Sequence, residues 1–342
     1  MSDRSRSEAI EVLTAIWKHV LQQPSIQTED NFFDLGGDSS LAAELFNEIA
    51  KECGRELLPV MIYQAPTIAA LADVLALPIA PRLPTLVQLR AGTKQPPVFM
   101  AHGLGGSAID FFQPVRYIEP QHPIYGMQAR GFDGVEKPFE RIEDMAEFFL
   151  NAIRELQPCG PYFLIGYSLG GLVALEMAQQ LSENGEKVAL LALLETYPHP
   201  RYLSLRQRVR LSARITGRQL VALLRKPTLE ALSNIVHSPR RPRNISRNGL
   251  EGSLTMHRVR ESAYLALTRY RPRFYKGKIK FVRAEISSSY PDDAGAVWTN
   301  LADEFEDTTV PGDHLGIITT HFATLGAVLS RYLREASPEE NG

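Results

Sequence analysis

The spacing of hydrophobic residues divides the chain near residue 85. Between Ser7 and Gln22 the apolar positions recur every three or four residues, which predicts an amphipathic helix. A second helix is expected to begin near Ser39. A short last one runs from Pro66 to Leu77, because proline is well accommodated in a first helical turn. The pattern therefore predicts a small helical bundle over residues 1–78. Prolines in and beside residues 79–84 predict a stiff, extended linker there.

After residue 85, short apolar runs alternate with helical patterns, which predicts a mostly parallel sheet with helices on both faces. Residues 201–273 interrupt this alternation with a long, helical insertion, and insertions of this kind often act as lids. We therefore expect one α/β domain over residues 85–337, with a helical lid at about 201–273. The expected strands are Leu86–Leu89, Val98–His102, Pro123–Gln128, Tyr162–Gly166, Val188–Leu194, Ile279–Ala284 and Thr308–Pro311; the expected helices are Ile142–Leu156, Leu169–Asn184 and Leu315–Glu335.

Composition and charge restrict the class of protein. A chain of 342 residues favours two domains, and a net charge of -2 gives no reason to expect a nucleic-acid or membrane partner. The charge is unevenly divided, however. Residues 1–78 hold twelve acidic and five basic side chains, whereas residues 198–283 hold three acidic and 21 basic ones. An acidic bundle and a basic insertion could therefore attract one another.

The cysteines and the apolar runs indicate a cytoplasmic protein. The two cysteines, Cys53 and Cys159, fall in different predicted domains, so a disulfide framework is not expected and a reducing cytosol fits. The first residues lack the apolar core of a signal peptide. The longest strongly apolar run, Val188–Leu194, is too short to cross a bilayer.

A first candidate serine follows a glycine pair in the run 30–41, Asp-Asn-Phe-Phe-Asp-Leu-Gly-Gly-Asp-Ser-Ser-Leu. Adjacent glycines allow a tight loop that delivers Ser39 to the start of a helix. Free backbone N–H groups and the helix dipole favour a phosphodiester at such a position. The alternative is that Asp38 or Ser39 only caps the helix, as both residue types do well.

The run 30–41 resembles the attachment site of peptidyl and acyl carrier proteins. The resemblance implies that Ser39 receives 4'-phosphopantetheine from coenzyme A and that a phosphopantetheinyl transferase is a partner. Ser40 stands where the family usually has an apolar residue, but the register relative to the glycine pair favours Ser39.

A second candidate serine lies in residues 166–171, Gly-Tyr-Ser-Leu-Gly-Gly, between a predicted strand and a predicted helix. This context is the one that the nucleophile elbow Gly-x-Ser-x-Gly requires, so Ser168 is predicted to be a nucleophile. His314, in a loop after the last predicted strand, is the candidate general base. His102 and His321 are the competing histidines; the first ends an early strand and the second falls within the last predicted helix.

An acyl-transfer site also needs an oxyanion hole and an acid. The backbone N–H groups of Leu169 and Leu104 are the expected oxyanion donors. Glu195 and Glu285 each end a strand, and either could orient the histidine. Asp313 is disfavoured because neighbouring side chains in a loop usually diverge. No metal site is predicted.

Residues 86–335 resemble the thioesterase domains that end nonribosomal peptide and polyketide synthetases. The resemblance rests on the run 97–103, the serine elbow, the strand end Leu-Leu-Glu-Thr and the Gly-Asp-His of residues 312–314. It implies an α/β-hydrolase fold with the acid after the strand 188–194, which favours Glu195 as the third member of the catalytic triad. The family usually has aspartate there.

The two resemblances together predict a small all-α four-helix carrier bundle followed by an α/β-hydrolase domain with a helical lid. The predicted function is release of an acyl or peptidyl chain from a phosphopantetheinyl carrier through a Ser168 acyl-enzyme, in secondary-metabolite biosynthesis. Hydrolysis, cyclisation and transfer remain open. The alternatives are a carrier scaffold with a degenerate hydrolase domain, an editing hydrolase and an acyltransferase.

The condensation and adenylation domains that precede such a pair in a terminal module are not in this sequence. Upstream synthetase domains or modules are therefore expected partners, in trans if the protein is free-standing or in cis if it is a piece of a longer chain. No nucleic-acid or membrane partner is expected.

Overall fold

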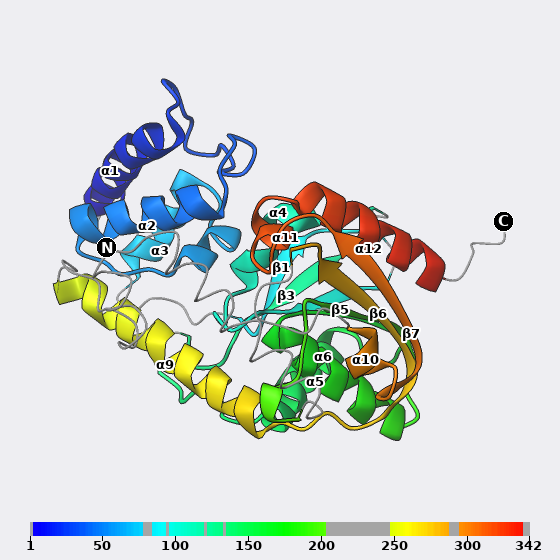
Figure 1. Ribbon diagram of the computed structural model, residues 1–342. Helices are drawn as coiled ribbons and strands as arrows, with labels where there is room; N and C mark the ends of the chain where they lie inside the picture. The colour runs from blue at the N-terminus through cyan, green and yellow to red at the C-terminus, as the bar shows by residue number, and fades with distance from the viewer. Residues whose placement is uncertain are drawn as a thin grey trace, which may run out of the picture.

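The computed structural model describes residues 3–77, 84–93, 96–119, 122–132, 135–202, 247–286 and 294–337. A helical unit formed by the first part of the chain lies beside an α/β unit formed by the rest (Figure 1). Residues 203–246 of the predicted lid, and most of the predicted linker, lie outside the described residues.

The helical unit is built around one apolar core. Its described elements are α1 (Asp3–Leu21), α2 (Ser39–Cys53), the 3-10 helix η1 (Pro59–Tyr63) and α3 (Ile68–Ala76). Trp17 and Phe32 are fully buried in this core, with their rings edge to face at 5.2 Å. Asp38 caps α2 and accepts a hydrogen bond from the Leu41 N–H (2.8 Å). Thr67 caps α3 in the same way, so Pro66 lies before the cap and not in the first turn as predicted.

The α/β unit contains a seven-stranded sheet in the order β1-β3-β2-β4-β5-β6-β7. Strand β1 pairs antiparallel with β3, and every other pair is parallel. The bounds are β1 Leu86–Arg90, β2 Val98–Ala101, β3 Ile124–Met127, β4 Tyr162–Tyr167, β5 Val188–Leu194, β6 Tyr275–Ala284 and β7 Ala302–Val310. All seven predicted strands are present, and the predicted fold class is confirmed.

Strands β6 and β7 begin several residues earlier than predicted. Their first halves are charged and partly exposed, so they lack the continuous apolar pattern of a buried strand. Cross-strand ion pairs replace that pattern: Lys278 Nζ lies 2.9 Å from Glu306 and Lys280 Nζ lies 3.1 Å from the same carboxylate. Pairing between charged side chains therefore extends the sheet beyond its apolar part.

Helices cover both faces of the sheet (Figure 1). On one face α5 (Ile142–Leu156), α6 (Leu169–Glu183) and the end of α9 (Arg247–Arg269) enclose one core. On the other face α4 (Phe112–Val115), α11 (Gly316–Thr319) and α12 (Phe322–Ala336) enclose a second core. The short helices η2 (Ala108–Phe111), η3 (Pro200–Tyr202) and α10 (Gly295–Trp298) lie in the connections.

The single helix predicted over Leu315–Glu335 is divided into α11 and α12. The Asp313 carboxylate accepts a hydrogen bond from the Gly316 N–H (2.7 Å), which fixes the turn that starts α11. His321 has non-helical backbone angles and becomes the N-cap of α12. The prediction that His321 lies inside the helix is therefore wrong, because the first turn belongs to the loop that presents His314.

Helix α9 belongs to the predicted lid and is anchored at its C-terminal end. The Tyr270 hydroxyl donates to the buried carboxylate of Glu176 on α6 (2.9 Å), and Arg273 lies 3.1 Å from the same group. Arg269 pairs with Glu140 ahead of α5 (2.8 Å). Within the described residues no helix combines the length and the apolarity needed to cross a membrane.

The two units touch through an apolar contact. The Phe33 ring lies 4.3 Å from the Phe112 ring, and the Tyr63 ring lies 5.7 Å from it. Beside these rings a small buried cluster joins η1 to β1 and η2; it contains Val60, Val87 and Ala108. The described contact therefore uses aromatic and aliphatic side chains, whereas most of the basic insertion lies outside the described residues.

Candidate active site

Ser168 sits in a sharp turn between β4 and α6. Its backbone angles, φ 56° and ψ -117°, are strained for a residue with a side chain. The turn is possible because glycine surrounds the serine: a Cβ at Gly166 would lie 2.2 Å from the Gly170 carbonyl oxygen, and one at Gly170 would lie 2.2 Å from that of Ala101. The serine is left half-buried at the carboxyl end of the parallel strands.

Ser168, His314 and Glu195 form a chain of side-chain contacts in which the imidazole lies between the serine hydroxyl and the carboxylate. The Nε2 atom of His314 lies 3.1 Å from the Ser168 Oγ, and its Nδ1 atom lies 3.3 Å from a Glu195 carboxylate oxygen. Tyr167 positions the histidine through two contacts. Its hydroxyl donates to the His314 carbonyl (2.7 Å), and its ring stacks on the imidazole with the ring centroids 5.1 Å apart. The order nucleophile, imidazole, carboxylate is the one that proton transfer requires.

The structure brings Glu195, and not Glu285, to the histidine. Glu195 directly follows β5 and is 3% exposed. Its second carboxylate oxygen accepts a hydrogen bond from the Ala284 N–H at the end of β6 (2.7 Å). Glu285 is exposed, and its backbone N–H pairs with β7. The carboxylate of the neighbouring Asp313 accepts from the Gly316 N–H in the turn before α11, whereas the carboxylate at His314 Nδ1 is that of Glu195.

The competing histidines occupy other positions. His102 is 2% exposed, packs edge to face on Phe149 at 5.9 Å, and places its Nδ1 atom 2.7 Å from the Gly103 carbonyl oxygen. Burial lowers the pKa of His102, so its ring is neutral. His321 packs near Gly312 at the start of α12. Among these three histidines in the described part of the chain, His314 is the one whose ring lies within hydrogen-bond distance of the Ser168 hydroxyl.

The expected oxyanion donors lie where two backbone segments meet. Leu169 is the first residue of α6, so its N–H has no partner within the helix. Leu104 lies in the loop after β2. A Cβ on Gly170 would lie within 2.3 Å of the His102 carbonyl, so the end of β2 presses directly on the start of α6. This close approach puts the 102–104 loop beside the elbow.

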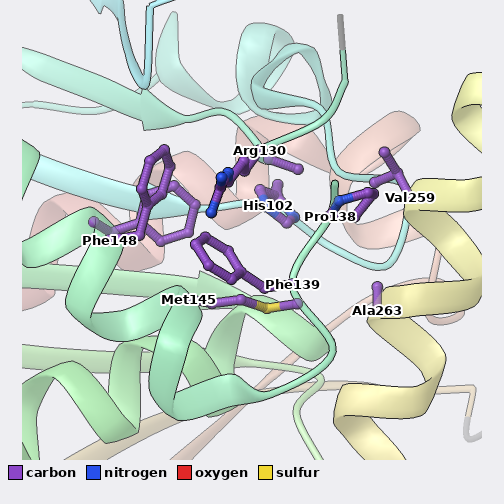
Figure 2. A pocket seen from close by; sticks show the side chains of 10 residues that line it. His102, Arg130, Pro138, Phe139, Met145, Phe148, Val259 and Ala263 are labelled. Carbon is purple, nitrogen blue, oxygen red and sulfur yellow. The ribbon is translucent and has the colours of Figure 1, made fainter. Parts of the chain in front are cut away.

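A small, largely apolar pocket lies beside this loop, with α9 along one side (Figure 2). Side chains from α5, from α9 and from the segment 129–139 form its walls, with His102 at one side. Arg130 is the one charged side chain in its lining, and its guanidinium stacks on Phe139 at 4.8 Å. Within the described ranges no cluster of His, Cys, Asp and Glu is suited to a metal ion.

Ser39 is the first residue of α2, a helix of fifteen residues. Gly36 has a φ of +92°, and a Cβ on Gly37 would lie 2.3 Å from the Phe32 ring, so this loop requires both glycines. The N-cap Asp38 accepts from the Leu41 N–H, the first turn of α2 itself carries no acidic residue, and the free N–H groups of a helix start favour an anion such as a phosphodiester. The backbone therefore fits phosphopantetheine; the Ser39 side chain lies outside the described part of the structure.

Comparison with known proteins agrees with both halves of this picture. Residues 96–334 match the family model described as thioesterase domain, and residues 11–75 match the model described as phosphopantetheine attachment site. A dimodular nonribosomal peptide synthase of Bacillus subtilis is 40% identical over 195 residues, which is 57% of this chain and 8% of that protein. Enterobactin synthase component F of Escherichia coli is 34% identical over 191 residues, which is 55% of this chain and 15% of that protein.

Solved structures show the same arrangement of secondary structure. A four-domain nonribosomal peptide synthetase bound to AMP and glycine matches 98% of this chain with 26% of its own, at a TM-score of 0.60 and 22% identity. The NocB thioesterase domain from the nocardicin cluster matches 70% of this chain with 95% of its own, at a TM-score of 0.51 and 21% identity. The chain spans only a small part of the synthetases it matches. It belongs to the thioesterase domain family and carries, ahead of that domain, a phosphopantetheine attachment domain of the kind that occurs in nonribosomal peptide synthetases.

Proposed function

We propose that this chain releases an acyl or peptidyl group from its own carrier domain through an acyl-enzyme on Ser168. The observation that carries the proposal is the alignment of Ser168, His314 and Glu195, in the same chain as a phosphopantetheine attachment domain. When attached at Ser39, phosphopantetheine supplies the thiol that holds the acyl group as a thioester. Phosphopantetheinyl transferase and upstream synthetase domains, in cis or in trans, are the proposed partners.

The chemistry follows from the site geometry. His314 Nε2 takes the proton of the Ser168 hydroxyl as the oxygen attacks the thioester carbon. Glu195 accepts the Nδ1–H bond, which fixes the tautomer and stabilises the imidazolium that forms. The backbone N–H groups of Leu169 and Leu104 stabilise the oxyanion of the tetrahedral intermediate. As the C–S bond breaks, His314 gives the proton to the departing thiolate, which leaves as a thiol, and an ester remains on Ser168.

The second half-reaction repeats these roles with a new nucleophile. His314 deprotonates water, a hydroxyl or an amine, and the attack on the ester restores the Ser168 hydroxyl. Hydrolysis, cyclisation and transfer to an acceptor all use this sequence. The free thiols of Cys53 and Cys159 are in keeping with the proposed location in the cytoplasm.

The main alternative is a carrier scaffold with a degenerate hydrolase domain. It is suggested by Glu195, which stands where the family usually has aspartate. The 3.1 Å approach of His314 to Ser168 and the burial of Glu195 support an active site instead. A serine-directed fluorophosphonate separates the two, because it labels an active Ser168 and leaves an inactive one unmodified.

Intact mass spectrometry tests the proposal directly. After incubation with coenzyme A and a broad-specificity phosphopantetheinyl transferase, wild type and Ser40→Ala are expected to gain about 340 Da, whereas Ser39→Ala gains nothing. Transfer of acyl-phosphopantetheine from an acyl coenzyme A by the same enzyme is then expected to give a transient acyl adduct in wild type and a persistent one in Ser168→Ala. Equal loss of the acyl group from both proteins would overturn the assignment of Ser168.

A further inference from the structure

The peptide unit that joins Gly103 to Leu104 is held by two hydrogen bonds. The Gly103 carbonyl oxygen lies 2.7 Å from His102 Nδ1 and also accepts from the Gly106 N–H at 3.2 Å. The same planar, trans peptide unit carries the Leu104 N–H, which points opposite to that carbonyl. Any group that fixes the carbonyl direction therefore also fixes the direction of the Leu104 N–H.

Glycine at position 103 makes such a constraint necessary. A Cβ there would lie 2.9 Å from the Tyr167 ring, so the residue before Leu104 cannot carry a side chain. Glycine has the widest conformational freedom of any residue, and its neighbouring peptide planes rotate easily when nothing holds them. The orientation of the Leu104 N–H thus depends on hydrogen bonds to the Gly103 carbonyl.

The state of the His102 ring follows from its surroundings. A carbonyl oxygen can only accept a hydrogen bond, so the Nδ1 atom that faces it carries the proton. The ring is buried against Phe149, and burial lowers the pKa of His102, so the imidazole is neutral. In a neutral ring with its proton on Nδ1, the Nε2 atom carries no proton. His102 is therefore a donor to the loop, while His314 is the histidine that contacts the Ser168 hydroxyl.

We propose that His102 is a positioning residue that aims the Leu104 N–H at the oxyanion formed on the substrate, through its hydrogen bond to the Gly103 carbonyl. This inference rests on the proposed function and assigns no proton transfer to His102. Because an oxyanion donor acts on the transition state more than on the bound substrate, its misalignment lowers kcat and leaves KM nearly unchanged.

Two substitutions isolate the donor. In His102→Asn the side-chain amide nitrogen stands where Nδ1 stood and can still donate, whereas His102→Leu fills the apolar site without a donor. With octanoyl-N-acetylcysteamine as the substrate, we expect His102→Leu to lower kcat by about 10–100-fold with KM within about twofold, since loss of a whole oxyanion donor costs about 100–1,000-fold. His102→Asn is expected to stay within about fivefold of wild type in kcat, with KM unchanged.

Nitrogen-15 NMR of the histidine rings in the wild-type protein provides a test that needs no variant. A neutral His102 with the proton on Nδ1 between about pH 7 and pH 8 is the expected result, because burial lowers its pKa below the ordinary value. A proton on Nε2 would break the bond on which the inference depends, and it would overturn the proposal even if both variants failed to fold.

The outcomes separate this inference from the proposed function. If wild type turns over the thioester, and a folded His102→Leu matches it in kcat, the positioning role is wrong and the proposed function stands. If the folded Asn and Leu variants are equally slow, the donor is not what matters and the inference also fails. If wild type neither turns over the thioester nor reacts with a fluorophosphonate at Ser168, the proposed function itself is wrong, while the NMR result still decides the His102 bond.

Discussion

At the scale of single residues, Glu195 departs from the aspartate usual in this family. The residue has a φ of 46°, an uncommon conformation for a side chain of this kind. Its N–H donates to the Val282 carbonyl (2.8 Å), while one carboxylate oxygen accepts from Ala284. Backbone pairing to β6 and a carboxylate bond to the same strand thus hold the longer side chain at His314.

Replacement of Glu195 by glutamine tests its role. The amide oxygen of Gln can keep the bond to the Ala284 N–H, but the charge that stabilises the imidazolium is lost. We expect kcat for a small acyl thioester to fall by at least about 100-fold, with little change in the thermal unfolding midpoint. The matched control, Glu285→Gln, removes the exposed alternative carboxylate and is expected to leave kcat unchanged. The reverse pattern would make Glu285 the acid.

Asp110 in η2 gives a pH-dependent contribution to stability. Burial raises the pKa of its carboxyl to about 6, so the folded protein binds this proton more tightly than the unfolded chain does. Stability therefore falls as pH rises from about 4 to about 7, because the unfolded pKa is near 3.9. The loss is on the order of 1–2 kcal/mol for this half-buried group.

Thermal unfolding between pH 5 and pH 8 measures this effect. Asp110→Asn is expected to be more stable than wild type at pH 8. Its unfolding midpoint is also expected to fall less than that of wild type as pH rises. Asp303→Asn, on the exposed side of β7, is the control and is expected to follow the wild-type curve. Parallel curves for wild type and Asp110→Asn would show that this carboxyl is not the titrating group.

At the scale of elements, close contact between α6 and the end of β2 organises the site. Gly170 makes this contact, since a Cβ would lie 2.2 Å from one backbone carbonyl oxygen of β2 and 2.3 Å from the next, that of His102. Backbone atoms at the end of a central strand cannot move aside cheaply. The second glycine of the serine elbow therefore sets the distance between the nucleophile and the oxyanion loop as well as allowing the turn itself.

Gly170→Ala is accordingly expected to reduce both stability and activity. We expect a loss of at least about 2 kcal/mol in unfolding free energy, as for other overpacked cores, and a fall in kcat of more than about tenfold. Gly105→Ala is the matched control, because a Cβ at that position meets nothing within 4 Å and its φ is not positive. Denaturant unfolding and thioester kinetics measure the pair, and equal behaviour of the two variants would contradict the packing argument.

At the scale of the whole molecule, the aromatic contact between the two units is the feature that bears on delivery of the acyl group. Phe33 lies in the loop that leads to Ser39, and it packs on Phe112 of the hydrolase unit with Tyr63 alongside. The contact is apolar, although the charges of the two halves of the chain would also allow electrostatic attraction. Apolar contacts are weakly sensitive to salt, whereas exposed charge pairs are screened.

Phe112→Ala tests whether this contact assists release. Release from the loaded carrier is expected to slow by about fivefold or more, because effective concentration falls when the domains no longer associate. Turnover of a free small thioester is expected to stay at the wild-type value. Phe322→Ala, which removes an aromatic ring on the same face that contacts Tyr117 rather than the carrier, is the control.

Salt then distinguishes apolar from electrostatic docking. If the aromatic contact dominates, wild-type release from the carrier changes by less than about twofold up to about 0.5 M salt, since screening acts on exposed charges. A steep decline over that range, with no effect of Phe112→Ala, would instead support docking of the acidic carrier on the basic insertion.

The sequence by itself determined the local features of this protein. The serine elbow, the glycine pair before Ser39 and the seven apolar runs were visible because each depends on residues within one turn or one strand. The charged first halves of β6 and β7, the 3-10 helix η1 and the break at His321 were not visible, because cross-strand ion pairs and loop packing decide them.

The residue pattern left Glu195 and Glu285 open and the family resemblance favoured Glu195; the tertiary structure places Glu195 at His314 and shows the hydrogen bond that His102 makes. Glu195 and His314 are 119 positions apart in the chain, and they meet because the parallel order β5-β6-β7 brings the carboxyl ends of these strands to one edge. The sequence showed His102 as one of three candidate bases. Its hydrogen bond to the Gly103 carbonyl forms in a buried position where the ring packs on Phe149 of α5, and a local pattern of residue types does not show such a contact.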